Sequence, residues 1–247
     1  MNIRNYLDST YLKTALQAGI SEIENKKIAL ACTQEAINEK FKLVMIRPEY
    51  VQAVKEIIVA QNSDVLVGTV IGFHQGTAAI HVKLNEAKKA IDDGVDELDF
   101  VVNFEAFKKG EVDTVKDEIL QGTQLGLQYH KTVKWIIETA ALDTHQIIQL
   151  STLIKNVVIS HFKESDYEKV FVKSSTGFYK TPDGIPNGAT IEGITTMLEN
   201  AFPLPVKASG GVKNLEAALE MIQLGVKRIG TSSAKTIVSG QNTNNDY

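Results

Sequence analysis

The chain has 247 residues, with a hydrophobic content of 43% and a charged content of 23%, which are the proportions of an ordinary soluble globular protein. Its net charge of −4 provides no basic surface for nucleic acid, and no apolar run approaches the length of a membrane span. The single cysteine, Cys32, excludes an intrachain disulfide, and the first residues contain no apolar signal-peptide core. We therefore expect a cytoplasmic protein that binds neither nucleic acid nor membranes.

Along the chain, short apolar segments alternate with segments of helical periodicity. The Ser21-x-x-Glu24 pattern is a capping box that opens a helix. Thr77 is placed to cap a later helix, and Gly94 and Gly225 are placed to end helices. The predicted strands cover residues 8–13, 41–46, 65–71, 97–102, 133–137, 170–173, 206–207 and 227–230. The predicted helices cover about 21–40, the segment from 48, 78–93, 112–127, 144–157, 190–200, 215–224 and 232–238.

This alternation of about eight strands with about eight helices, without a linker between them, predicts one α/β domain. The strands are almost continuously apolar, which indicates a parallel sheet covered on both faces. An open Rossmann-type sheet would carry a G-x-G-x-x-G turn after its first strand, and the sequence has none. Polar residues at the C-terminal ends of many strands favour the closed alternative. We therefore expect a single-domain (βα)8 TIM barrel over residues 1–240 and a flexible polar tail over 241–247.

Within a barrel, alternate residues of each strand point inward. On the fourth strand this pattern places Asp99 inside and Phe100 against the helices. On the fifth strand it places Lys134 inside and Trp135 outside. Asp99 and Lys134 therefore form either a structural ion pair or part of a site, and the sequence does not decide between the two.

Two lysines end consecutive predicted strands. Lys173 follows Val-Phe-Val and precedes Ser-Ser-Thr-Gly, and Lys207 follows Leu-Pro-Val and precedes Ala-Ser-Gly-Gly. The two motifs are about one βα unit apart, so parallel strands carry both amines to the same end of the barrel. Desolvation of an ammonium group is costly, so two buried lysines at strand ends indicate a function.

Neighbouring lysines support amine catalysis. A second cation beside Lys173 lowers its pKa, so that part of it is free amine near neutral pH. A free amine forms a Schiff base with an aldehyde or ketone, and the protonated imine accepts electrons when a carbon–carbon bond breaks. Asp99 is placed to shuttle the protons.

Two loops of small residues suggest a phosphate site. Gly210 and Gly211 follow the seventh strand, while Ser232 and Ser233 follow the eighth and lead into a short helix. Loops at these positions of a barrel commonly bind phosphate through backbone N–H groups. The alternative is ordinary turn chemistry, but two such loops in the expected strand order favour a phosphate site.

Several segments resemble those of deoxyribose-phosphate aldolase, in the same order and across nearly the whole chain. They are residues 8–13 (DSTYLK), 69–73 (TVIGF), 96–103 (DELDFVVN), 138–139 (ET), 171–177 (FVKSSTG), 206–212 (VKASGGV) and 228–233 (RIGTSS). The resemblance implies a (βα)8 barrel and a class I aldolase, which needs no metal or other cofactor.

Such enzymes cleave 2-deoxy-D-ribose 5-phosphate reversibly to D-glyceraldehyde 3-phosphate and acetaldehyde. The resemblance makes Lys173 the Schiff-base lysine, Lys207 the cation that lowers its pKa and Asp99 the proton shuttle. The substrate-binding residues that it implies, phosphate site included, are Thr10, Lys134, Gly177, Gly210, Gly211, Ser232 and Ser233. The expected partners are a small phosphosugar and acetaldehyde.

Three positions depart from the family pattern. Met45 stands where many members have a cysteine, His74 where a proline is common, and Phe178 where some members have a lysine near the phosphate. None of these departures removes the catalytic set, but they bear on phosphate affinity and on the choice of acceptor aldehyde.

Two other functions remain open, a metal-dependent aldolase and a non-catalytic barrel that binds sugar phosphates. The five histidines show no paired spacing typical of metal ligands. A binding protein would need the phosphate loops but not Lys173 beside Lys207. The sequence does not give the oligomeric state, for which a homodimer is one option.

The predicted tail ends in Tyr247. Some members of the family end in a tyrosine thought to assist proton transfer at the acetaldehyde carbon. Two interpretations are open: a disordered end without function, or a tail that folds over the site so that the Tyr247 hydroxyl helps to move a proton at the enamine carbon.

Overall fold

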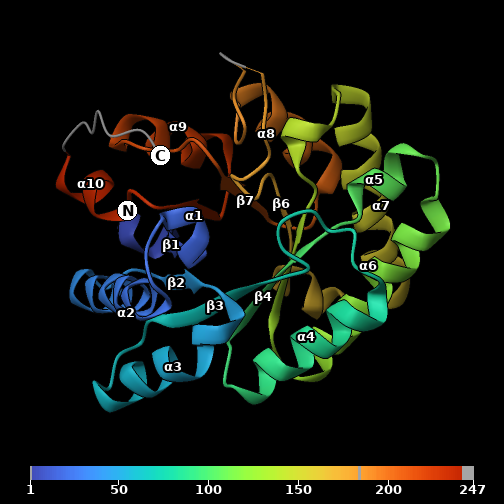
Figure 1. The fold of residues 1–247 in the computed structure, drawn as a ribbon. Helices are drawn as coiled ribbons and strands as arrows, with labels where there is room; N and C mark the ends of the chain where they lie inside the picture. Colours follow the sequence, from blue (N-terminus) through green and yellow to red (C-terminus); the bar gives the residue numbers. More distant parts are fainter. Residues whose placement is uncertain (1, 183–184, 241–247) are drawn as a thin grey trace.

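The computed structural model describes residues 2–182 and 185–240. Its strands are parallel and close into a barrel in chain order, with β8 paired to β1 (Figure 1). The strands are β1 (Leu7–Tyr11), β2 (Leu43–Ile46), β3 (Leu66–Ile71), β4 (Glu97–Val101), β5 (Thr132–Ile136), β6 (Val170–Lys173), β7 (Val206–Ser209) and β8 (Arg228–Thr231). The predicted (βα)8 TIM barrel is confirmed.

Helices surround the barrel on its outer side (Figure 1). The α-helices are α1 (Ala15–Ala18), α2 (Glu22–Glu39), α3 (Val51–Ala60), α4 (Ile80–Asp92), α5 (Phe104–Lys108), α6 (Val112–Gln128), α7 (Thr144–His161), α8 (Ile191–Ala201), α9 (Leu215–Leu224) and α10 (Ala234–Ser239). The 3-10 helices are η1 (Ile3–Tyr6), η2 (Pro48–Tyr50), η3 (Thr139–Ala141) and η4 (Glu164–Lys169). The short helices α1 and α5 are absent from the sequence prediction, because one turn of helix shows no periodic pattern.

Two helix boundaries lie at residues that the sequence predicts, Ser21 at the start of α2 and Gly225 at the end of α9. The Ser21 hydroxyl accepts a hydrogen bond from the Glu24 N–H, and the Glu24 carboxylate accepts one from the Ser21 N–H at 3.0 Å. Asn214 caps α9 by accepting a bond from the Ala217 N–H. Gly225 ends α9 in the left-handed conformation, with a φ of 119°. The sequence therefore contains the boundaries of both α2 and α9.

The prediction that Thr77 caps a helix is wrong. The residue that caps α4 is Ala79, and its side chain makes no capping bond. Thr77 instead lies in the loop after β3, where the Gly76 N–H donates to the Gly72 carbonyl at 3.0 Å. The loop therefore extends past Thr77, and α4 begins only at Ile80.

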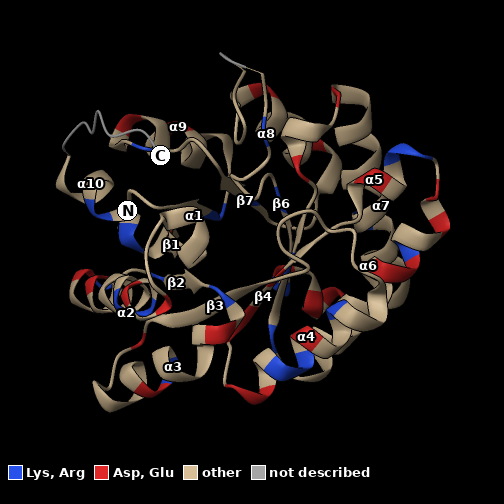
Figure 2. Ribbon diagram, in the orientation of Figure 1, with Lys and Arg blue, Asp and Glu red and all other residues tan. Residues whose placement is uncertain are grey.

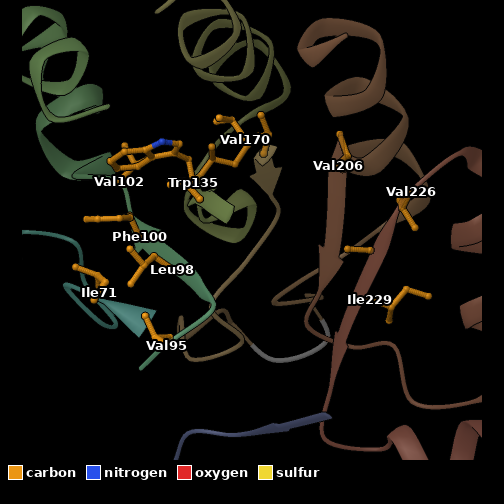
Figure 3. Close-up of a cluster of buried hydrophobic side chains, with 14 of the residues drawn as sticks. Ile71, Val95, Leu98, Phe100, Val102, Trp135, Val170, Val206, Val226 and Ile229 are labelled. Atoms are coloured by element: carbon orange, nitrogen blue, oxygen red, sulfur yellow. The ribbon is translucent and has the colours of Figure 1, made fainter. Parts of the chain in front are cut away.

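The apolar core lies between the strands and the surrounding helices (Figure 3). Outward residues of β4 and β5 contribute to it, and the rings of Phe100 and Trp135 stack with their centroids 4.9 Å apart. The Trp135 indole N–H donates to Thr123 Oγ1 on α6 at 2.9 Å. Gly122 allows α6 to approach, because a Cβ there would lie 2.7 Å from the Trp135 ring. The predicted alternation along β4 and β5 is confirmed, so their inward residues are left for the barrel interior.

The outer surface carries charges of both signs. Acidic and basic residues are interspersed over the outer helices, as α4 and α6 show (Figure 2). Over residues 2–182 and 185–240, no helix combines the length and the apolar character that a membrane crossing requires.

One lysine of the outer layer is fully buried. Lys83 on α4 donates to the carbonyl oxygens of Gly76 at 2.6 Å and Val101 at 2.7 Å, and it also contacts the Glu118 carboxylate on α6. Glu118 in turn accepts a bond from the Asn103 N–H at 2.9 Å. Lys83 thus joins the loop after β3, the end of β4 and helix α6.

We expect Lys83→Met to lower the free energy of unfolding by about 3–5 kcal/mol, because it leaves the Glu118 carboxylate buried without its cation. Denaturant unfolding followed by circular dichroism measures this change. Lys89→Met on the same helix is the control: its pair with Asp93 is exposed on the lysine side and should contribute little. Equal stability of the two variants would contradict the role of Lys83.

Candidate active site

Lys173, the last residue of β6, lies beside Lys207, the second residue of β7, and the parallel register pairs them directly. Their Nζ atoms are each 2.9 Å from the same atom, Oδ2 of Asp99 on β4. All three side chains are buried. The structure therefore brings together the two lysines and the carboxylate that the sequence singles out.

Six buried side chains in the barrel form a closed ring in which carboxylates and cations alternate. In order around the ring, they are Asp8, Arg228, Glu97, Lys134, Asp99 and Lys207. Arg228 donates from Nε to Asp8 Oδ1 at 2.8 Å and from Nη1 to Glu97 Oε1 at 2.9 Å. Lys134 contacts Glu97 and lies 2.7 Å from Asp99 Oδ1. Lys207 closes the ring, with its Nζ 2.6 Å from Asp8 Oδ2.

Lys173 is a seventh ionisable group, and it joins this ring at Asp99. The ring contains three carboxylates and three cations, so a protonated Lys173 adds a surplus positive charge. Burial lowers the pKa of Lys173 to about 8, with Asp99 opposing the shift and Lys207 adding to it. The charge of Lys207, which the sequence suggests as the main cause, ranks behind desolvation.

Asp99 is a carboxylate at neutral pH. Burial by itself would raise the pKa of Asp99, but Lys134, Lys173 and Lys207 together hold it well below its usual range. In this state the side chain can accept a proton from an adjacent group and has none to give.

A cavity of about 600 Å³ opens at the C-terminal ends of the strands, with Lys173 on its wall. This volume is typical of small-molecule sites. Five of the predicted substrate-binding residues also line the cavity: Thr10, Gly177, Gly210, Gly211 and Ser232.

Two predicted substrate-binding residues are not on the cavity wall, as far as the described residues form it. Lys134 is fully buried between Glu97 and Asp99, which favours the structural ion pair over contact with a substrate. Ser233 immediately precedes α10, and its N–H donates to Thr231 Oγ1 at 2.9 Å.

Glycines shape the loop after β7. Gly210 and Gly211 have φ values of 86° and 80°, in the left-handed region that favours glycine. Gly210 also packs against Gly188, and a Cβ on Gly210 would lie 2.7 Å from the Gly188 Cα. The loop before α8 therefore rests on the loop after β7, and both line the cavity.

Glu138 fixes the loop that follows Lys173, a role that the sequence patterns do not reveal. Its carboxylate accepts hydrogen bonds from Ser175 Oγ at 2.6 Å, from the Thr176 N–H at 3.2 Å and from the Thr176 hydroxyl. Burial raises the pKa of Glu138, although these donors oppose the shift. Its backbone is left-handed, with a φ of 58°, which is uncommon outside glycine and is often found at functional sites.

The ring contains three further residues to which the sequence patterns assign no role, namely Asp8, Glu97 and Arg228. Glu97 lies two positions before Asp99, and Arg228 lies two positions before Gly230, so both follow the inward alternation of their strands. All three also lie in segments that resemble the aldolase family. The alternation along the fourth strand already places Glu97 inside, two positions before Asp99. The same rule applied to the first and last strands would have pointed to Asp8 and Arg228.

The three departures from the family pattern lie at two places. Met45 belongs to a buried apolar cluster inside the barrel with Leu43 and Val70. His74 stacks on Phe178, with ring centroids 5.8 Å apart and planes inclined by 18°. Of the two residues, Phe178 lines the cavity that contains Lys173.

Two other expectations concern a tail residue and metal ligands. Tyr247 and the tail over 241–247 lie outside the described residues. Within the described ranges, no three His, Cys, Asp or Glu side chains gather in a way that could hold a metal ion.

Known proteins resemble this chain over its full length. It is 37% identical over 241 residues to a deoxyribose-phosphate aldolase of Thermococcus gammatolerans, covering 97% of this chain and 96% of that protein. It is 38% identical over 249 residues to a deoxyribose-phosphate aldolase of Staphylococcus epidermidis, covering 100% of both. The structure of a deoxyribose phosphate aldolase from Aeropyrum pernix, described as a unique tetramer, matches with a TM-score of 0.78 and 25% identity over 96% of this chain and 89% of that one. No family model matches the chain.

We expect the reactivity of Lys173 toward an amine-specific acylating reagent to rise with pH through a midpoint of about 8. Lys207→Leu should move this midpoint to higher pH, because it removes a neighbouring cation that disfavours the ammonium form. Peptide mass mapping of samples labelled across a pH series measures both midpoints.

The control is Lys83→Met, which removes another buried lysine at a contact that does not include Lys173. This variant should keep the wild-type midpoint. An unshifted midpoint in Lys207→Leu would show that the two amines are not electrostatically coupled.

Proposed function

The chain belongs to the deoxyribose-phosphate aldolase family and is therefore a lyase, and on this premise we propose that it cleaves 2-deoxy-D-ribose 5-phosphate reversibly to D-glyceraldehyde 3-phosphate and acetaldehyde through a Schiff base at Lys173. The observation that carries the proposal is an amine on a cavity wall with a pKa of about 8. At pH 7 such an amine is free in about one molecule in ten, whereas an ordinary lysine is free in fewer than about one in a thousand. Nucleophilic attack requires the free form.

In the proposed reaction, Lys173 Nζ adds to the C1 aldehyde of the open-chain sugar, and loss of water gives a protonated imine. The C3 hydroxyl then loses its proton while the electrons of the C2–C3 bond move toward the imine nitrogen. Glyceraldehyde 3-phosphate leaves, and an enamine remains on Lys173. Protonation of the enamine at C2 and hydrolysis of the imine release acetaldehyde and restore the amine.

Asp99 supports this reaction as a base. Its Oδ2 lies 2.9 Å from Lys173 Nζ, within reach of the proton that the amine sheds during addition. Because the pKa of Asp99 is held low, the carboxylate passes this proton on instead of keeping it. This behaviour fits the shuttle role that the family resemblance implies.

The phosphate is proposed to bind at the loops after β7 and β8. Gly211 and Ser232 line the same cavity as Lys173, and Gly177 lines it from the β6 side. Ser233 follows Ser232 and precedes α10, and a helix N-terminus favours an anion, although the N–H of Ser233 itself donates to Thr231 Oγ1. This arrangement leaves the space between Lys173 and the two loops for the carbon chain of the sugar.

A non-catalytic sugar-phosphate barrel is the second candidate, and it would use the same loops. A barrel that only binds sugar phosphates would not need a buried lysine with a lowered pKa, whereas the balanced ring leaves Lys173 as a surplus cation. Cytoplasmic location and a homodimer stay predictions, and the Aeropyrum pernix relative is described as a tetramer.

Treatment with acetaldehyde and borohydride should attach a reduced two-carbon unit to Lys173, since borohydride reduces an imine to a stable amine. Peptide mass mapping locates the modification. Samples without acetaldehyde, and Lys173→Met, should show none at this position. A modification found on Lys207 instead, or on no lysine, would rule out the proposed mechanism.

Asp99→Asn should lower kcat by roughly 100-fold, the usual loss when an acid–base group is removed. The imine should still form, because the loss of the Asp99 charge favours the free amine of Lys173. Steady-state cleavage and borohydride trapping at pH 7 measure the two effects.

The matched control is Glu97→Gln, which removes another carboxylate of the ring, one bound to Lys134 and Arg228. It should reduce stability in a similar way but lower kcat much less. Equal losses of kcat in the two variants would assign Asp99 a structural role only.

A further inference from the structure

Ser209, the last residue of β7, has a buried hydroxyl without a hydrogen-bond partner among residues 2–182 and 185–240. The residue is 5% exposed, and it lines the cavity that contains Lys173. A buried hydroxyl normally finds a partner, because leaving it unpaired costs free energy. We therefore expect a ligand bound in the cavity to supply the hydrogen-bond partner of the Ser209 hydroxyl.

The strand alternation fixes the direction of this side chain. Ala208 packs in the outer core with the helices, while Lys207 points into the barrel. Ser209 follows Lys207 by two positions and shares its inward face. One step along the same face is about 6–7 Å, so Ser209 lies one layer above Lys207, toward the open end of the barrel.

The backbone N–H and carbonyl of Ser209 are both hydrogen-bonded, whereas its hydroxyl has no partner among the described residues. Its N–H donates to Ser174 Oγ at 2.9 Å, and its carbonyl accepts from the Ser174 hydroxyl at 2.9 Å and from the Ala189 N–H at 3.1 Å. On β8, Gly230 pairs with Ser209, and a Cβ there would collide with Ser209 Oγ. The glycine thus leaves room for the hydroxyl at the cavity wall.

We propose that the Ser209 hydroxyl binds the C4 hydroxyl of the phosphosugar and so selects acceptor aldehydes that carry a hydroxyl next to the carbonyl. This inference rests on the proposed function. Under the proposed function, C1 is attached to Lys173 and the phosphate binds at Gly211 and Ser232, so the middle of the carbon chain would pass the end of β7. The C3 oxygen exchanges its proton in the layer of Asp99 and Lys173, and C4 therefore lies in the next layer, beside Ser209.

The test uses the condensation of acetaldehyde with two acceptors that differ in one hydroxyl, D-glyceraldehyde 3-phosphate and 3-oxopropyl phosphate. The ratio of kcat/KM for the first acceptor to that for the second measures the selection of the hydroxyl. Ser209→Ala should lower this ratio about tenfold, because one hydrogen bond to the substrate is lost. It should not lower the unfolding midpoint, since Ser209 Oγ bonds to no described residue.

The matched control is Ser151→Ala. Ser151 on α7 also has a buried hydroxyl without a partner in the described part of the chain, but it is not among the residues that line the cavity. This variant should keep the wild-type ratio. The control shows whether removing a buried, unpaired hydroxyl changes acceptor selection in general.

An unchanged ratio in Ser209→Ala overturns the inference, and so does an equal loss of kcat/KM for both acceptors, which would indicate a structural effect. The failure of the proposed function looks different: the wild type would then form no borohydride-trapped adduct with acetaldehyde. That result would also remove the basis of the inference about Ser209. If acetaldehyde is trapped at Lys173 in the wild type and in Ser209→Ala, and the ratio of kcat/KM is lower in Ser209→Ala, the result supports the proposed function and the role of Ser209.

Discussion

The barrel depends on the pairing of buried charges around a closed ring. Charged side chains are costly to remove from water unless each has partners of opposite sign. Asp8, Glu97 and Asp99 each lie between two cations of the ring, and each ring cation lies between two carboxylates. The ring joins β1, β4, β5, β7 and β8, so a one-residue slip in any of these strands would remove a member and leave its neighbours unpaired.

The same pairing explains why the pKa of Lys173 is lowered to about 8. Lys83 pairs with Glu118. Lys134 lies between Glu97 and Asp99, and Lys207 lies between Asp8 and Asp99. Lys173 reaches only an oxygen that Lys207 already contacts, as far as the described ion pairs go. At Lys173 the effect of desolvation therefore outweighs the attraction of Asp99, and the pKa of the amine is lowered.

Local patterns predict most of the fold and the centre of the candidate site. The alternation along β4 and β5 is enough to separate the inward Asp99 and Lys134 from the outward Phe100 and Trp135. The ring as a whole could not be predicted in this way. Asp8 and Arg228 contact each other only because the barrel closes between its first and last strands, which no local pattern reveals.

Helix faces show the same limit. Apolar spacing on α4 suggests a face formed by Ile80, Leu84, Ala87 and Ile91, whereas the buried residues are Lys83, Ala87 and Ala90. A lysine is read as polar and exposed by any periodicity rule. Only the carbonyl groups and the carboxylate that surround Lys83 make its burial favourable, and they come from other segments of the chain.

The position of Arg228 on the last strand has a consequence for the charge of Lys173. A chain that ends before β8 contains Asp8, Glu97 and Asp99 against Lys134, Lys173 and Lys207, and these charges balance only when Lys173 is protonated. The arrival of Arg228 supplies a further permanent cation and makes the charge of Lys173 the surplus one. The lowered pKa of Lys173 in the folded barrel therefore depends on the last strand, because Arg228 completes the charge balance of the ring without the charge of Lys173.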